Sequence, residues 1–123
     1  MADIHEALIR RFRKRVLKGG LRETKSPMPS YRPDIYAERL GYNGRVLEQL
    51  AVEAEIPSTL FSVHTTEQLL KMHEFMELQR IKRIKVRGFL LVPKSKQVDA
   101  HARLMLSGLF PEGTDIKVVG VNQ

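Results

Sequence analysis

The feature that most constrains the fold is the segment Ile84–Val92, which is rich in β-favouring residues and stops at Pro93. A short, nearly continuous run of this kind is typical of a strand in the interior of a sheet. Helical patterns flank it on both sides. One helix is expected over about 66–79, with a Thr65–Gln68 capping box and an apolar stripe of Leu69, Met72, His73 and Met76. The other begins after Ser95 and carries the stripe Val98, Ala102, Met105, Leu106 and Leu109.

The remaining segments complete a mixed pattern. Apolar residues at every fourth position predict a helix over 3–18, which ends at Gly19-Gly20, and residues 19–30 read as a flexible link. The segment 31–40, the turn 41–44 and the alternating segment 46–56 predict a hairpin, and 116–121 a last strand. The predicted order, α-β-β-α-β-α-β in one domain over residues 1–123, gives an α/β (mixed α+β) fold. Its central mixed β-sheet is flanked by helices on both faces.

Charge is distributed unevenly along the chain. The 21 Lys and Arg residues exceed the 14 Asp and Glu residues, which gives a net charge of +7. Residues 1–25 and 71–96 each carry eight basic residues, whereas 26–70 carry six acidic and three basic ones. Basic surface is the usual footprint of a polyanion partner, and the acidic middle would repel that partner unless a cation lay between them. The alternative is that these carboxylates are merely solvated.

Several classes of protein are disfavoured. The chain has no cysteine, so a disulfide scaffold, a thiolate metal site and a Cys nucleophile are excluded. The longest uninterrupted apolar stretch, Phe89–Val92, is too short to span a bilayer, and charges throughout residues 1–18 argue against a secretory signal. We therefore expect no membrane partner and a cytoplasmic location, the host cell cytoplasm if the source is viral.

Three acidic residues form the main candidate site. Asp34 starts the first strand of the hairpin, and Glu53 and Glu55 share one face of the second. Hairpin pairing would bring the three carboxylates together, where they repel one another unless a cation neutralises them. Mg²⁺ or Mn²⁺ prefers such oxygen ligands, shares them with phosphates and activates water. The pattern therefore predicts metal-dependent phosphodiester hydrolysis.

These residues resemble a known family. Arg32-Pro33-Asp34-Ile35, a hairpin turn and Val52-Glu53-Ala54-Glu55-Ile56 look like the PD-(D/E)XK nuclease superfamily, whose fold is the restriction-endonuclease-like core. The resemblance implies that Asp34 and Glu53 bind Mg²⁺ with help from the Ala54 carbonyl. Glu55 stands where the family usually has lysine, and it would act as a second metal ligand or as the general base.

Three further positions are weaker candidates. Gln68 resembles a glutamine near the active site in some branches of the family, or it reaches back to cap Thr65. Glu6 matches an additional acid of some members or is a surface residue, and Lys71 could replace the absent lysine or is solvated. For nucleic-acid binding we expect two basic tracks: Arg10, Arg11, Arg13, Lys14 and Arg15, and Arg80, Lys82, Arg83, Lys85 and Arg87.

The sequence thus predicts a small Mg²⁺-dependent nuclease, acting on DNA rather than RNA, sequence-tolerant or structure-directed, and homodimeric. An inactive nucleic-acid-binding accessory protein with the same fold is the alternative. A third interpretation is a structural protein in which the acids pair with Arg32 and Arg45.

Overall fold

The computed structural model describes residues 4–122, which form three helices and five strands. The helices are α1 (Ile4–Lys18), α2 (Val63–Ile81) and α3 (Lys96–Leu109), and the strands are β1 (Arg22–Glu23), β2 (Ile35–Leu40), β3 (Val46–Ala54), β4 (Lys85–Pro93) and β5 (Ile116–Val121). No helix in this part of the chain is long and apolar enough to cross a membrane.

The five strands form one mixed sheet in the order β1-β2-β3-β4-β5. The first three strands are antiparallel neighbours, and β3, β4 and β5 are parallel. Each parallel pair is joined by a helix, as such connections require. The β2–β3 register places Ile35 opposite Val52, so the residue before β2, Asp34, lies at the end of β3.

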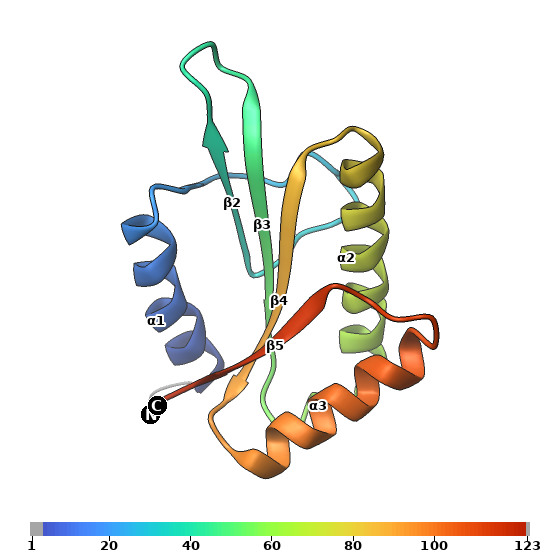
Figure 1. Ribbon diagram of the computed structural model, residues 1–123. Coiled ribbons are helices and arrows are strands. Elements are labelled where there is room, and N and C mark those ends of the chain that lie inside the picture. Colours follow the sequence, from blue (N-terminus) through green and yellow to red (C-terminus); the bar gives the residue numbers. More distant parts are fainter. Residues whose placement is uncertain (1–3, 123) are drawn as a thin grey trace.

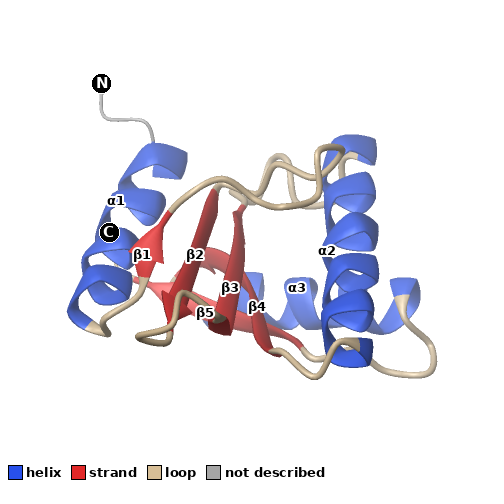
Figure 2. Ribbon diagram, turned by 90° about the horizontal axis from the view of Figure 1, so that it is seen from above, coloured by secondary structure: helices blue, strands red, loops and turns tan. Residues whose placement is uncertain are grey.

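Helices cover both faces of the sheet, as the sequence predicts (Figures 1 and 2). On one face α1 packs through Leu8, Phe12 and Val16 against β2, β3 and β4. On the other face α2 and α3 bury residues such as Leu69 and Met105 with the opposite side of the same strands. The sheet is therefore covered by helices on both sides.

Helix α2 approaches β4 closely where the strand has a glycine. A Cβ atom at Gly88 would lie 2.5 Å from the sulfur of Met76 and 3.1 Å from the sulfur of Met72. The missing side chain at this position lets the two elements pack without a gap.

Four details differ from the sequence prediction. Residues 19–30 are not all a flexible link, because Arg22–Glu23 pairs with β2 and makes the order α-β-β-β-α-β-α-β. Strand β2 begins at Ile35 rather than at 31, so Asp34 precedes the strand, and strand β3 ends at Ala54 rather than at 56. The Thr65–Gln68 capping box is wrong, because α2 begins earlier: its N-cap is Ser62, whose hydroxyl accepts from the Thr65 amide, and Thr65 is fully buried.

Candidate active site

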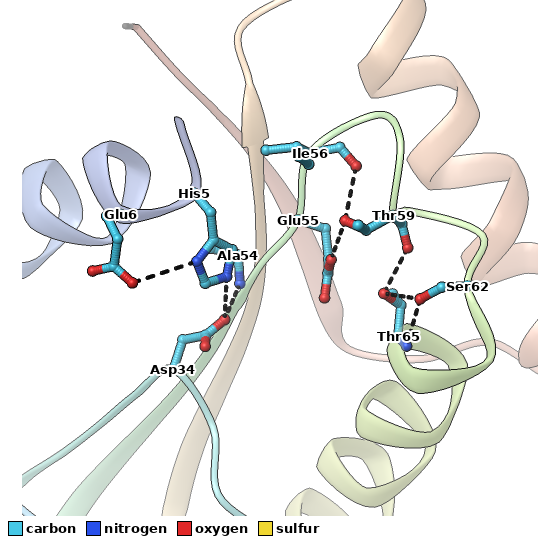
Figure 3. A network of polar contacts seen from close by, with 9 residues as sticks. All are labelled: His5, Glu6, Asp34, Ala54, Glu55, Ile56, Thr59, Ser62 and Thr65. Atoms are coloured by element: carbon cyan, nitrogen blue, oxygen red, sulfur yellow. Dashed lines mark hydrogen bonds and ion pairs between the residues drawn. The ribbon is translucent and has the colours of Figure 1, made fainter. Parts of the chain in front are cut away.

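The candidate site lies at the end of the sheet at which the central strand β3 stops and at which α1 and α2 begin (Figures 1 and 3). Asp34 precedes β2, Glu53 is the penultimate residue of β3, and Glu55 follows that strand. Alternation along β3 turns Val52 and Ala54 toward α1 and Glu53 toward α2. The hairpin therefore brings Asp34 beside Glu53, as the sequence predicts.

Asp34 is held by contacts from two other elements. One of its carboxylate oxygens accepts a 2.8 Å hydrogen bond from the backbone amide of Ala54. The same oxygen lies 3.4 Å from Nε2 of His5, whose other ring nitrogen is 3.7 Å from Glu6 (Figure 3). The carboxylate thus ties α1 and the end of β3 together.

Glu53 is the most strongly perturbed carboxyl group of the site. Its side chain is buried, and one carboxyl oxygen has no hydrogen-bond partner. Burial, followed by the charges of Asp34 and Glu55 and a hydrogen bond with Asp34, raises the pKa of Glu53 to about 9. With a pKa of about 9, Glu53 holds a proton at neutral pH, because burial and the neighbouring negative charges disfavour its ionised form.

Glu55 faces a different set of partners. It is buried, and its carboxylate accepts a 2.7 Å hydrogen bond from the Thr59 hydroxyl. The Thr59 carbonyl in turn accepts from the Thr65 hydroxyl on the first turn of α2 (Figure 3). The loop between β3 and α2 thus holds Glu55 near Glu53, and the charge of Glu55 raises the pKa of Glu53. The hydrogen bond from Thr59 occupies one of the two Glu55 carboxylate oxygens.

Two further side chains, Tyr31 and Gln68, each have a buried polar atom without a partner. The Tyr31 hydroxyl is fully buried without a hydrogen bond, and burial together with the charges of Glu53 and Asp34 raises the pKa of Tyr31. The carbonyl oxygen of Gln68, near the start of α2, is equally unpaired. Since Ser62 caps this helix, Gln68 is not engaged at Thr65, and its unpaired oxygen is available to a ligand.

Sequence reasoning missed Tyr31 as a functional candidate. An aromatic residue directly before Arg32-Pro33-Asp34 was the available signal, but its burial depends on contacts from α2, where Tyr31 packs against Phe75 with ring centroids 5.7 Å apart. The two weaker candidates remain peripheral. Glu6 is mostly exposed, and Lys71 is half-buried and takes part in no ion pair within residues 4–122.

The first basic track lies on α1. Arg10, Arg11, Lys14 and Arg15 are exposed and line a groove with the end of β5, whereas Arg13 forms a 2.8 Å ion pair with Glu23. Because α1 begins beside Asp34 and rises about 1.5 Å per residue, Arg10 lies about 8 Å along the helix from His5. This track therefore starts near the site and leads away from it.

The second basic track lies at the other end of the sheet. Lys85 pairs with Glu48, five residues before Glu53, which corresponds to about 16 Å along β3. Arg80 is ion-paired with Glu77 and Asp115, and Arg87 with Glu48, while Lys82, Arg83 and Lys85 are exposed. The structure does not bring this track to the carboxylates, although β4 itself adjoins β3.

Apart from the contact of His5 with Asp34, the three acids have no cationic partner among the described residues. Within the described residues, no Arg or Lys forms an ion pair with Asp34, Glu53 or Glu55, so the pairing with Arg32 and Arg45 expected of a purely structural role is not present. Over the same residues, no group of three or more His, Asp or Glu side chains is arranged to hold a metal ion. Carboxylate ligation would therefore rest on the Asp34–Glu53 pair, and the remaining oxygens would come from other groups.

Comparison of the chain with family models, with curated proteins and with solved structures gave no match.

Proposed function

We propose that this protein is a divalent-cation-dependent nuclease that hydrolyses phosphodiester bonds in DNA, with the restriction-endonuclease-like core of the PD-(D/E)XK superfamily. The observation that carries the proposal is the pairing of Asp34 with a buried Glu53 that keeps one oxygen unsatisfied. A buried carboxyl pair of this kind is costly unless a proton or a cation neutralises it. The net charge of +7 supports a polyanionic substrate.

The residues at the end of β3 fit a hard cation such as Mg²⁺ or Mn²⁺, because the side-chain atoms without hydrogen-bond partners, those of Glu53 and Gln68, are oxygens. Asp34 and Glu53 would hold the ion, with Gln68 and the Ala54 carbonyl as further oxygen donors. When bound, the cation supplies Lewis-acid polarisation of a phosphoryl oxygen. Glu53 would give up its proton on binding, and Asp34 would keep its hydrogen bond to the Ala54 amide.

Glu55 would act on the attacking water. It lies next to Glu53, and the Thr59 hydroxyl holds one of its oxygens at 2.7 Å. That hydrogen bond orients the carboxylate, and the second oxygen would orient the water and accept its proton as general base. Such an arrangement replaces the lysine that the family usually has at this position.

The same contact supports the alternative function, a catalytically inactive nucleic-acid-binding protein. Thr59 and Glu55 form a closed polar pair, and no lysine occupies the position of Glu55. This alternative predicts salt-sensitive binding that does not depend on metal.

Cleavage of supercoiled, linear, single-stranded and branched DNA in Mg²⁺ or Mn²⁺ tests the proposal. We expect nicking or degradation of at least one substrate, and its loss in Asp34→Ala and Glu53→Gln. The control is Glu112→Gln, which changes an exposed carboxylate on the α3–β5 turn. Undiminished cleavage by Asp34→Ala would refute the assignment. Binding without cleavage of any substrate would favour the inactive alternative.

A further inference from the structure

A cleft adjoins Asp34, and it is formed largely by the chain segment that precedes β2. Residues between Glu23 and Tyr36 line this cleft of about 470 Å³, and Asp34 is one of them. Small-molecule sites occupy about 300–1,000 Å³, so the cleft has room for one nucleotide unit. It combines apolar and cationic groups, among them Lys25, Met28, Tyr31, Arg32 and Tyr36.

The charges around the cleft favour an anion. Lys25 and Arg32 are exposed and form no ion pair within residues 4–122. The charge of Glu23, the other acid in the lining, is already compensated by Arg13 at 2.8 Å. The cleft therefore presents two uncompensated cations, and Asp34 is the acid that the candidate active site itself uses.

Tyr31 gives the cleft a buried polar group without a partner. Its side chain is 0% exposed, lines the cleft and lies within electrostatic reach of Glu53 and Asp34. The hydroxyl makes no hydrogen bond. Buried polar groups are nearly always paired, and leaving one unpaired costs about 1–3 kcal/mol. An unsatisfied donor here is explained if a ligand supplies the acceptor.

We propose that this cleft binds the nucleotide of a DNA strand next to the phosphodiester that Asp34 and Glu53 face. Lys25 and Arg32 contact its phosphates, and the sugar and base lie against Met28 and Pro29. The buried Tyr31 hydroxyl, reached by a small shift of the cleft lining, donates a hydrogen bond to the nucleotide. The position of the cleaved bond rests on the proposed function, whereas the binding itself needs neither metal nor catalysis.

The first test measures binding of a labelled single-stranded DNA oligonucleotide by fluorescence anisotropy, in EDTA and over a series of salt concentrations. The variant is Lys25→Ala with Arg32→Ala, and the control is Lys96→Ala with Lys117→Ala. The control removes the same charge from exposed positions on α3 and β5. Loss of two phosphate contacts makes the negative slope of log K against log salt shallower by about 1.4. The same slope and affinity in variant and control would overturn the proposal.

The second test uses Tyr31→Phe, which keeps the ring and removes only the hydroxyl. Loss of one hydrogen bond to the nucleotide weakens binding about fivefold, whereas the folded protein is not destabilised. Affinity equal to that of the original protein would overturn the role of the hydroxyl. Tighter binding of the matching RNA oligonucleotide through the same residues would overturn DNA as the occupant.

The nuclease function and the nucleotide-binding cleft can be refuted independently of each other. If the protein cleaves no DNA in Mg²⁺ but the variants still lose binding, the nuclease function is wrong and the cleft stands. If Asp34→Ala abolishes cleavage but the Lys25/Arg32 variant binds and cleaves like the original protein, the cleft is wrong and the nuclease function stands.

Discussion

Replacing Glu53 with Gln should stabilise the protein by an amount that grows with pH. The pKa of this carboxyl is raised from 4.5 to about 9 in the folded protein, so the folded state keeps a proton that the unfolded chain releases. Wherever the folded state binds more protons, the free energy of unfolding falls as the pH rises. Gln resembles the protonated acid in shape and has no proton to lose.

The size of the effect follows from the pKa values. Each pH unit between 4.5 and 9 costs the original protein about 1.4 kcal/mol. At pH 7 the variant should therefore be more stable by about 3 kcal/mol, and near pH 4.5 the two proteins should be about equally stable. Groups that do not interact with Glu53 titrate alike in both proteins, so their contribution cancels in the difference between the two stabilities.

Urea unfolding of both proteins between about pH 5 and pH 9 measures this difference. Glu112→Gln, an exposed change of the same type, should show no such slope. Adding Mg²⁺ should stabilise the original protein increasingly at higher pH, because the cation competes with the proton on Glu53, and should not stabilise Glu53→Gln. A difference between the two proteins that does not change with pH would show that Glu53 is ionised when folded, and would refute the account of the site.

Four further changes have defined outcomes. Asp34→Asn keeps an acceptor for the Ala54 amide but removes a charge, so the protein should stay folded, the pKa of Glu53 measured by NMR should fall, and cleavage should be lost. Tyr31→Phe should raise the free energy of unfolding by about 1 kcal/mol in urea, because it removes an unpaired buried hydroxyl; a loss of stability would mean that the hydroxyl has a partner. Gly88→Ala should destabilise by about 1–3 kcal/mol, since the new methyl group meets methionine sulfur atoms, and an unchanged melting temperature would contradict this packing. Ser62→Ala should cost about 1 kcal/mol through loss of the α2 cap, whereas Ser58→Ala in the preceding loop should cost less.

The fold was largely predictable because hydrophobic patterns repeat over many residues. The alternation in 46–56 and the β-rich run ending at Pro93 located β3 and β4, and the helices on both faces followed. Strand β1 was missed because two residues carry no period. The start of α2 was misplaced because Val63 is exposed and lies off the apolar stripe, so the pattern begins only after the true cap, Ser62.

The site was predictable only where it depends on local pairing. Asp34 and Glu53 face each other across a hairpin, whose register the sequence suggests. The engagement of Glu55 with Thr59 depends on a loop conformation, and the burial of Tyr31 depends on the docking of α2. The distance of the second basic track from the acids depends on the parallel register of β3 and β4, which no local pattern reveals.

The β2–β3 hairpin can form from neighbouring segments, whereas β3 pairs with β4 only after the intervening helix α2 has crossed over. Glu53 is desolvated at that later event, since its side of the strand is covered by α2. At neutral pH the folding chain must then take up a proton. If α2 docks before the transition state, the refolding rate should change with pH. If α2 docks after the transition state, the unfolding rate should change with pH instead. Stopped-flow kinetics at several pH values would thus report when this helix joins the sheet.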